Sequence, residues 1–367
     1  MFKRILNNRI KEKFFRGKAI IIVGPRQVGK TTMGLTVSEG YERIIFNCDN
    51  PTERELLNNK DINFLVGIIG NAEIIFIDEA QKVESIGQTL KLLVDYYRNK
   101  KQIIATGSST KNLLDNTHEP LTGRKIVFTL YPLSMQEIYL GKKLEILKDL
   151  DHNLVFGSYP EVFNAKSFDE KIELLKELNS SYLFKDIFEF QQIRNSNIIF
   201  NLVKALALQI GNEVSYNEIA NTLGIDKITV EKYIDLLEKN FIVFRLPPYT
   251  KNKRREISKH KKIYFYDLGI RNAVINNFIF SDSRDDYGHL FENFCVLERM
   301  KYREYRGINA NHYFWRTYDG AEIDLVEERG GDLFSFEFTL GNKAKKAPEG
   351  WKNYKVITKK DLSGFIL

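Results

Sequence analysis

The chain has 367 residues, of which 43% are hydrophobic and 28% charged, and this composition excludes a protein that is disordered throughout. The length exceeds that of one ordinary hydrophobic core, so we expect two or three domains. A formal net charge of +7 favours anionic partners. The two cysteines, Cys48 and Cys295, lie far apart, which excludes a cysteine-rich zinc module and favours a reducing compartment.

The start of the chain, Met1-Phe-Lys-Arg, leads into asparagine and charged residues rather than an apolar segment, so no secretory signal is predicted. No run approaches the roughly 18 apolar residues of a membrane-spanning helix. We therefore expect a cytoplasmic protein with no membrane association.

The first strong motif is the loop Gly24–Thr31, which reads Gly-Pro-Arg-Gln-Val-Gly-Lys-Thr. An apolar run, 19–23, precedes it and a segment that can be helical, 31–38, follows it, as this motif requires. The glycines let successive backbone N–H groups point at one phosphate, and the N-terminus of the helix favours an anion. The motif therefore predicts binding of a nucleoside triphosphate.

Within this motif, Lys30 is expected to reach the β- and γ-phosphates, and the Thr31 hydroxyl can bind Mg²⁺. The predicted nucleotide-binding residues are Gly24, Pro25, Arg26, Gln27, Val28, Gly29, Lys30, Thr31 and Thr32.

The second strong motif is the apolar run 74–77, which leads directly into Asp78 and Glu79. Such a run predicts a strand buried on both faces. Because ligands gather at the carboxyl ends of parallel strands, both carboxylates are expected beside the phosphate loop. We predict that Asp78 holds the Mg²⁺ shell and that Glu79 is the general base that orients the attacking water.

A third strand, 102–106, is predicted to end at hydroxyl-bearing residues. Thr106 or Ser108 could sense the γ-phosphate; the alternative is that these hydroxyls cap the next helix. Arg124 precedes another predicted strand, 125–130, and could neutralise transition-state charge in its own site or in that of a neighbouring subunit. The second possibility would need a homo-oligomer, and the alternative to both is a surface arginine.

One more strand, 43–48, and an amphipathic helix, 87–98, complete this region. Five strands that alternate with helices predict a doubly wound α/β domain over residues 1–142.

The middle of the chain divides into two predicted regions. Residues 143–200 are rich in Lys, Glu and Leu at helical spacing, which favours a helical connector or lid. Residues 201–270 contain a capped helix near 215–223, a Gly224 turn, a second helix near 228–238 and two strands. This order is typical of a winged helix-turn-helix.

The predicted wing is strongly basic. Lys253, Arg254 and Arg255 lie in it, and the run 259–262 follows. Phosphate contacts with DNA would suit these charges. The alternative is a winged helix that binds a protein partner, with the charges solvated.

The C-terminal region, 271–367, contains Glu292 in a predicted helix and Asp324 and Glu337 in a predicted hairpin. Three such carboxylates can surround a divalent cation. The pattern resembles the PD-(D/E)xK nuclease fold, in which a lysine stands two residues after the second acid. Here that residue is Thr339, so Lys343 or Lys345 would have to reach back, and a degraded, inactive nuclease site is our prediction. An active nuclease and ordinary α/β packing are the alternatives.

The motifs together resemble those of prokaryotic AAA-type P-loop ATPases, and more narrowly the group fused to a C-terminal domain of unknown function. The resemblance rests on the loop 24–32, on Asp-Glu-Ala-Gln at 78–81, on Thr-Gly-Ser-Ser at 106–109 and on Thr-Gly-Arg at 122–124. It implies ATP and Mg²⁺ as ligands and a strand order of 5-1-4-3-2. By the same resemblance, Lys30 is the phosphate lysine, Thr31 and Asp78 bind the metal, Glu79 is the base and Arg124 is an arginine finger.

We therefore expect a Mg²⁺-dependent ATPase whose nucleotide cycle drives a C-terminal winged-helix region that contacts DNA. An ATP-regulated metal-dependent nuclease and a nucleotide-gated protein-interaction switch are the alternatives.

Overall fold

The computed structural model describes residues 2–108, 121–140, 142–182, 196–250, 260–280, 284–317, 319–341 and 346–367. The chain divides into two compact units, Met1–Tyr131 and Pro132–Leu367. None of the helices within these described ranges is both long enough and apolar enough to cross a membrane.

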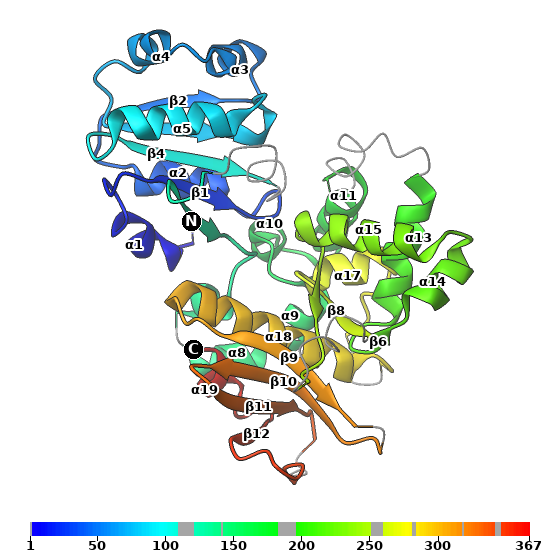
Figure 1. The fold of residues 1–367 in the computed structure, drawn as a ribbon. Coiled ribbons are helices and arrows are strands. Elements are labelled where there is room, and N and C mark those ends of the chain that lie inside the picture. The colour runs from blue at the N-terminus through cyan, green and yellow to red at the C-terminus, as the bar shows by residue number, and fades with distance from the viewer. Residues whose placement is uncertain are drawn as a thin grey trace. The chain divides into compact units, whose positions relative to one another are not determined.

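The first unit is built on a parallel sheet of five strands in the order β2-β3-β4-β1-β5 (Figure 1). Its strands are β1 (Ala19–Val23), β2 (Arg43–Asn47), β3 (Ile74–Asp78), β4 (Gln102–Gly107) and β5 (Lys125–Thr129). The predicted α/β fold class and the expected strand order are confirmed, and each predicted strand lies within one residue of an observed one.

The three inner strands β1, β3 and β4 are buried along their whole length, because helices cover both faces of the sheet. The chain crosses the sheet one way from β1 to β2 and the other way from β2 to β3 and β4. Right-handed crossovers therefore put α2 on one face and α5 on the other. The helices of this unit are α1 (Leu6–Lys11), α2 (Lys30–Val37), α3 (Pro51–Asn58), α4 (Ile62–Ile69), the short η1 (Ala80–Lys82) and α5 (Ile86–Tyr97).

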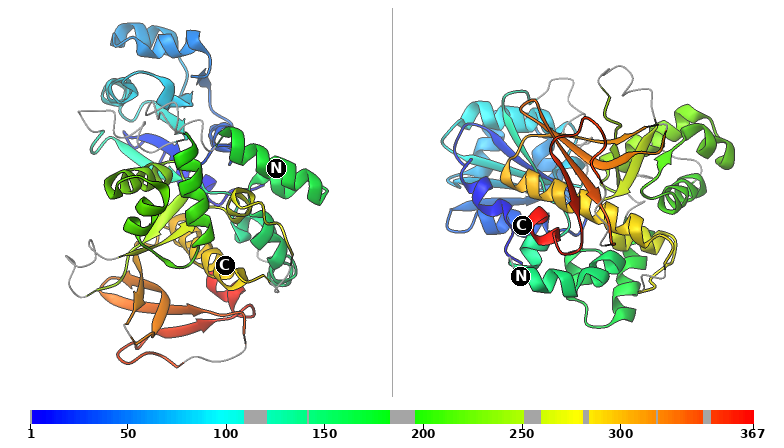
Figure 2. Two further views of the ribbon diagram at one scale, coloured as in Figure 1. Left: turned by 90° about the vertical axis from the view of Figure 1, so that its right-hand side faces the viewer. Right: turned by 90° about the horizontal axis from the view of Figure 1, so that it is seen from below.

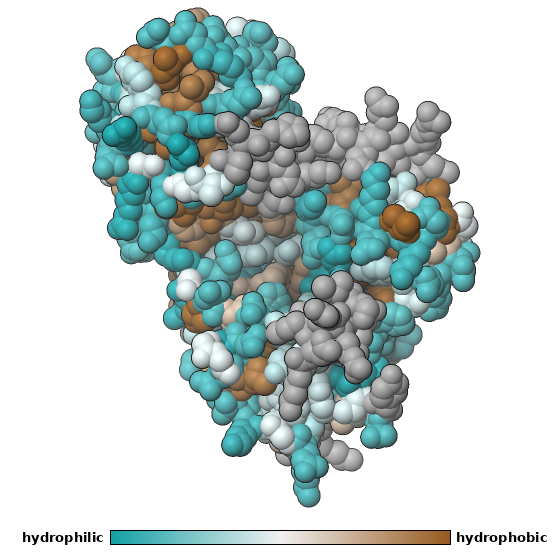
Figure 3. Space-filling model, in the orientation of Figure 1, coloured by the Kyte–Doolittle hydropathy of each residue, from teal (hydrophilic) through white to brown (hydrophobic). Residues whose placement is uncertain are grey.

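Strand β2 is an edge strand and most of its residues are exposed. Ile45 of this strand is 42% exposed, and Phe64 of α4 is 36% exposed. Figure 3 shows brown apolar side chains near the α3 and α4 end of this unit, within an otherwise hydrophilic surface.

The second unit begins with short helices, and all of them except the first, α7, lie in the described part of the predicted connector. These are α7 (Met135–Tyr139), α8 (Lys143–Lys148), α9 (Leu150–Phe156), α10 (Pro160–Asn164), α11 (Phe168–Glu177) and the π-helical turn η2 (Leu178–Tyr182).

A helical group with a small antiparallel sheet follows. Its elements are α13 (Ser196–Leu208), β6 (Glu213–Val214), α14 (Tyr216–Leu223), α15 (Lys227–Lys239), β7 (Val243–Leu246) and β8 (Lys261–Phe265), and its strands pair in the order β6-β8-β7. Helix α14 ends at Gly224, which adopts the left-handed conformation (φ 66°) that glycine tolerates best. The turn between α14 and α15 follows from this residue.

The C-terminal part is a four-stranded sheet in the order β12-β11-β10-β9, with α18 packed along one face (Figure 2). A β-bulge between Ile323 and Val326 interrupts the pairing of β10 with β9. The elements are α17 (Leu268–Val274), α18 (Tyr287–Arg306), β9 (Asn311–Arg316), β10 (Glu322–Arg329), β11 (Asp332–Phe338), β12 (Tyr354–Ile357) and α19 (Leu362–Ile366).

One hydrophobic core runs through the second unit. It contains Met135 of α7, Leu206 of α13, Phe294 of α18 and Ile366 of α19, each no more than 5% exposed. Helices α13 and α17 cross the positions 200/201 and 270/271, where the sequence analysis places domain boundaries. The boundaries were placed where the composition changes, and composition does not show whether one helix continues across such a position.

Candidate functional site

The phosphate loop lies between the end of β1 at Val23 and the start of α2 at Lys30. Two of its positions require glycine. A Cβ atom at Gly24 would lie 2.1 Å from the carbonyl oxygen of Leu130, and Gly29 caps α2 with a φ of 93°. The loop can therefore adopt this backbone conformation only with glycine at these two positions.

Lys30 is 5% exposed, and its ammonium group lies inside the loop. Its Nζ donates to the carbonyl oxygens of Gly24 at 3.0 Å and of Pro25 at 2.7 Å. The ammonium group that would bind the phosphates is thus hydrogen-bonded to the backbone of the phosphate loop itself. Of the other predicted loop residues, Val28 is buried, Arg26 is half-buried, and Gln27 and Thr32 are exposed.

Arg4 lies just before α1, outside the motif, and its side chain forms hydrogen bonds that hold the phosphate loop in place. Its Nη1 donates to the carbonyl oxygen of Val28 at 3.2 Å and its Nη2 to that of Tyr131 at 2.6 Å. This side chain is 8% exposed. Sequence reasoning missed Arg4, because nothing in the motif points to a residue so far upstream.

Asp78, at the end of β3, is the centre of a hydroxyl network. Its carboxylate accepts hydrogen bonds from the Thr31 hydroxyl at 2.8 and 3.0 Å and from the Thr106 hydroxyl at 2.5 Å. Thr106 comes from the neighbouring strand β4, and its oxygen also accepts the backbone N–H of Glu79 at 3.0 Å. The network brings together residues from the phosphate loop, β3 and β4.

Glu79 leaves the strand in the left-handed conformation, with a φ of 51°, which is uncommon for a residue other than glycine and typical of functional positions. Its carboxylate accepts a hydrogen bond from Gln81 Nε2 at 2.5 Å, and the same nitrogen lies 3.1 Å from the hydroxyl of Ser108. Gln81 was not predicted to act, although its position in Asp-Glu-Ala-Gln was the available signal.

The residues at this strand edge suit a magnesium ion. A threonine hydroxyl and a carboxylate are hard oxygen donors of the kind that Mg²⁺ prefers, and Thr31 Oγ1 lies 2.8 Å from Asp78 Oδ2. Thr31 and Asp78 would hold the ion, with the remaining ligands from water and phosphate.

Arg124 is placed differently from the other predicted residues. It precedes β5, and its neighbour Lys125 pairs with Ala19 at the start of β1. The phosphate loop begins after Val23, which is roughly 13 Å further along the strand at about 3.3 Å per residue. Arg124 Nε donates to Asp95 at 2.6 Å. The possibility that it acts in its own site is therefore wrong, and action on a neighbouring subunit stays a prediction.

The sheet order and the arrangement of the loop agree with comparison to known families. Residues 16–139 match a family model described as an AAA domain. The N-terminal unit carries an AAA domain. Residues 147–279 and 287–366 match two models described as domains of unknown function, DUF8612 and DUF4143. The predicted AAA-type module with a C-terminal domain of unknown function is confirmed.

Similar curated proteins are themselves uncharacterised. The chain is 25% identical over 333 residues to Rv2008c of Mycobacterium tuberculosis, which covers 90% of this chain and 72% of the relative. It is 28% identical over 346 residues to MJ1544 of Methanocaldococcus jannaschii, which covers 88% of this chain and 75% of the relative.

The following two solved structures align with the chain at low similarity. AMPPCP-bound DnaA from Aquifex aeolicus aligns over 64% of this chain and 86% of its own, with 17% identity and a TM-score of 0.33. The RuvB Holliday junction branch migration motor of Thermotoga maritima aligns over 70% and 95%, with 13% identity and a TM-score of 0.35. These scores are too low to transfer a function.

The three predicted nuclease carboxylates lie on neighbouring elements of the second unit: Glu292 on α18, Asp324 on β10 and Glu337 on β11, each no more than 8% exposed. Burial and the nearby Glu292 carboxylate raise the pKa of Asp324 well above its usual value. The Glu337 carboxylate contributes in the same direction. The fold therefore places these acids on neighbouring elements, and their assignment to a degraded nuclease site stays a prediction.

A lysine lies among them. Lys262 Nζ on β8 lies 2.8 Å from Glu292 Oε1, 2.6 Å from Glu322 Oε1 and 3.8 Å from Asp324 Oδ1. Lys262 is 2% exposed, so its assignment to a solvated basic wing is wrong. We call Lys262, Glu292, Glu322 and Asp324 the buried ion cluster.

Within the buried ion cluster, Lys262 and Glu292 stabilise each other's charged forms, whereas the charged form of Asp324 is disfavoured. Burial opposes the charged form of Lys262, but the Glu292, Asp324 and Glu322 carboxylates outweigh it and raise the lysine pKa. Burial likewise opposes ionisation of Glu292, and Lys262 with His289 lowers the pKa of that carboxyl. Among the described residues, no group of three or more His, Cys, Asp or Glu side chains is arranged to hold a metal ion. The lysine supplies the positive charge instead.

Five of the predicted residues, Lys253, Arg254, Arg255, Lys343 and Lys345, lie outside the described residues.

On α15, Lys227, Glu231 and Lys232 are exposed and Thr229 is half-buried. Ile228 on the same helix is 77% exposed.

Proposed function

We propose that the AAA domain binds ATP with Mg²⁺ and hydrolyses it. The observation that carries this proposal is the network in which the Asp78 carboxylate accepts from both the Thr31 and Thr106 hydroxyls beside the phosphate loop. A strand ending in exposed acids would not need hydroxyls from two other elements to converge on one carboxylate.

Each residue has a distinct role in this proposal. Lys30 moves from the loop carbonyls to the β- and γ-phosphates, and Thr31 with Asp78 fixes the metal. Mg²⁺, when bound, supplies positive charge to the phosphate oxygens. Glu79, held by Gln81, orients the attacking water and accepts its proton. Thr106 couples Asp78 to the backbone of Glu79, so that metal ligand and base keep a fixed spacing.

Two substitutions separate binding from turnover. Lys30→Ala is expected to abolish productive ATP binding, because it removes the charge that meets the phosphates. Glu79→Gln is expected to keep nucleotide affinity and to lose about a hundredfold or more in kcat, because the amide cannot accept a proton. Fluorescent-nucleotide binding and phosphate release measure the two effects. If Glu79→Gln hydrolyses ATP at the parent rate, Glu79 is not the base.

We further propose that the region α13 to β8 is a winged helix that contacts DNA under control of the nucleotide cycle. The support is the order of its elements, the Gly224 turn between α14 and α15, and the exposed Lys227 and Lys232 on α15. The basic residues 253–255 would add phosphate contacts. The nuclease alternative is less favoured, because no group of three or more His, Cys, Asp or Glu side chains among the described residues is arranged to hold a metal ion.

Neutralising Lys253, Arg254 and Arg255 together tests this second proposal. The triple Ala variant is expected to bind duplex DNA more weakly for every sequence and to show a smaller salt slope, by about 0.9 for each lost phosphate contact. Fluorescence anisotropy at several salt concentrations measures both, with Lys143→Ala as a control at an exposed lysine outside the region. Equal affinity and slope in variant and parent would favour a protein-binding role instead.

A further inference from the structure

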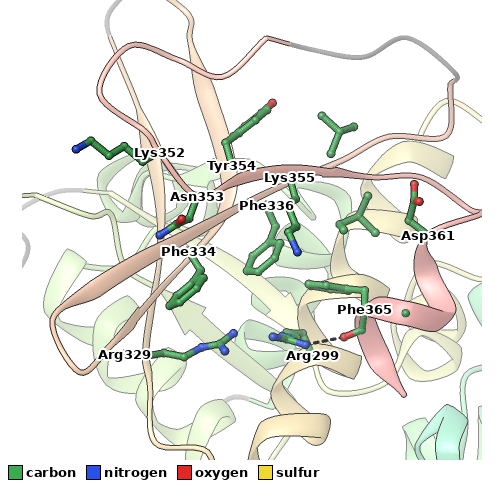
Figure 4. Close-up of a pocket in the computed structure, with 13 residues that line it drawn as sticks. Arg299, Arg329, Phe334, Phe336, Lys352, Asn353, Tyr354, Lys355, Asp361 and Phe365 are labelled. Carbon is green, nitrogen blue, oxygen red and sulfur yellow. Dashed lines mark hydrogen bonds between the residues drawn. The ribbon is translucent and has the colours of Figure 1, made fainter.

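A pocket lies in the C-terminal part, far along the chain from the phosphate loop. It has a volume of about 790 Å³ and is lined by residues of β10, β11, β12, α18 and α19. Figure 4 shows Phe334, Phe336, Phe365, Arg299 and Arg329 gathered on one side of the sheet. The side chain of Lys355 points to the same side, whereas Tyr354 points to the other.

The charges around this pocket are unbalanced. Its lining carries four basic side chains, Arg299, Arg329, Lys352 and Lys355, against one acid, Asp361. Asp361 accepts the hydroxyl of Thr358 at 2.6 Å, at the edge of α19. The pocket therefore combines an excess of basic side chains with phenyl rings in its lining.

Beneath the lining, one carboxylate forms ion pairs with three guanidinium groups. Glu327 is fully buried, and it pairs with Arg299 at 3.1 Å, with Arg303 at 3.2 Å and with Arg329. Burial lowers the pKa of Arg299, and burial together with the Arg299 and Arg303 guanidiniums lowers that of Arg329. The positive groups repel one another, and a bound anion would relieve that repulsion.

Aromatic rings hold the guanidinium groups in place. Arg299 lies 4.8 Å from the ring centre of Phe365, and its Nη1 donates to the carbonyl oxygen of that residue at 2.7 Å. Arg329 lies 4.7 Å from the ring centre of Phe334. Stacking of this kind fixes the plane of a guanidinium group. The three nitrogens of Arg299 already donate to Glu327 and to the Phe365 carbonyl oxygen, so Arg329 is the guanidinium that we consider for an oxyanion.

We propose that this pocket binds a phosphate ester that carries a planar ring, a ligand of the size of a mononucleotide. Arg329 and Lys355 would bind the phosphate, because a dianion matches more than one cation and Arg suits its geometry. The phenyl rings of Phe334 and Phe336 would contact the planar ring. A volume of about 790 Å³ lies within the range of small-ligand sites. The site is separate from the AAA domain and does not depend on ATP hydrolysis.

The experiment uses the full chain with Lys30→Ala, so that the phosphate loop does not contribute to binding. Isothermal titration calorimetry measures the affinity of AMP, ribose 5-phosphate and adenosine. Lys355→Glu and Arg329→Gln are added in turn, and Lys346→Glu is the matched control, since it makes the same charge change at an exposed lysine that does not line the pocket. Thermal unfolding checks that each variant is folded.

AMP is expected to bind at one site, about tenfold more tightly than ribose 5-phosphate and than adenosine. Lys355→Glu is expected to weaken AMP binding about tenfold, and Lys346→Glu to leave it unchanged. Absence of AMP binding, or equal weakening by the control, would overturn the site. Equal affinity for AMP and ribose 5-phosphate would overturn the contact with a planar ring. The ATPase assay of Glu79→Gln tests a site in the first unit, and the titration with AMP tests a pocket in the second. The proposal of ATP hydrolysis and the proposal of this pocket can therefore each be wrong without the other.

Discussion

At the scale of single residues, the proposed ATP turnover depends on the contacts that hold the Glu79 carboxylate. Gln81 Nε2 donates to it at 2.5 Å and reaches Ser108 at 3.1 Å, so one amide ties the proposed base to the end of β4. Ser108 was one of two predicted sensor residues. It has no direct hydrogen bond to Glu79 here and is linked to it through the Gln81 amide. The base, the glutamine and the hydroxyl form one chain of hydrogen bonds.

Gln81→Ala is expected to lower kcat about tenfold and to leave nucleotide affinity within about twofold, because the base loses its orientation while the phosphate contacts stay. Steady-state phosphate release and fluorescent-nucleotide binding measure the two quantities. Gln88→Ala is the control, since Gln88 is an exposed glutamine of the same domain. A loss of affinity without a loss of kcat would mean that Gln81 contacts the nucleotide rather than the base.

At the scale of elements, two helical glycines differ in what surrounds them. Gly34 lies on α2 where the helix meets the sheet, and an added Cβ would come within 2.4 Å of the Phe76 ring on β3. Gly67 lies on α4, and an added Cβ would have nothing within 4 Å. The first glycine allows α2 to approach the sheet, and the second has no packing reason.

Gly34→Ala is therefore expected to destabilise the protein by about 1–3 kcal/mol, because Phe76 or the helix must shift. Gly67→Ala is expected to stabilise it by about 0.5–1 kcal/mol through better helix propensity alone. Urea unfolding followed by circular dichroism measures both free energies. A neutral Gly34→Ala variant would show that the contact of α2 with β3 relaxes without cost.

At the scale of the whole molecule, the second unit is held together by more than its apolar core. The buried ion cluster joins β8, in the region that matches DUF8612, to α18 and β10, in the region that matches DUF4143. Tyr264 on β8 adds a hydrogen bond from its hydroxyl to Glu292 at 2.5 Å. Two regions that match separate family models thus share one network of charges.

Lys262→Met is expected to destabilise the second unit by about 3–5 kcal/mol, since it leaves buried carboxylates without their cation. In the parent, the raised pKa of Lys262 and the lowered pKa of Glu292 stabilise the fold between the ordinary pKa values of Glu and Lys. In the variant the carboxyl pKa values rise, so stability is expected to increase as pH falls from about 8 to 5.

Urea unfolding at several pH values measures this change, with Lys261→Met as the control at the preceding, half-buried residue of β8. A variant as stable as the parent at pH 8 would mean that the carboxylates find another cation or become protonated at little cost. The same preparations should show no Mg²⁺-dependent cleavage of duplex DNA, because the position two residues after Glu337 is Thr339 and not a lysine.

The local motifs were predictable from the sequence because each is a contiguous segment with its own geometry. The loop Gly24–Thr31 needs glycines and a helix start, and the run before Asp78 needs a fully buried strand; both patterns can be read without knowing what packs on them. The strand order followed from the resemblance that these motifs carry. The presence of an AAA domain and its sheet therefore did not require coordinates.

The tertiary structure alone decided how distant residues are combined. Lys262 looked like one of several solvated lysines, yet the pairing of β8 and the position of α18 enclose it among carboxylates. Arg124 seemed available to its own site, yet it precedes β5 and so lies at the opposite edge of a parallel sheet from the phosphate loop. Arg4 donates to the Val28 carbonyl oxygen only because the tertiary structure brings the start of the chain against the phosphate loop. Burial and charge pairing depend on contacts between segments far apart in sequence, and no local pattern encodes them.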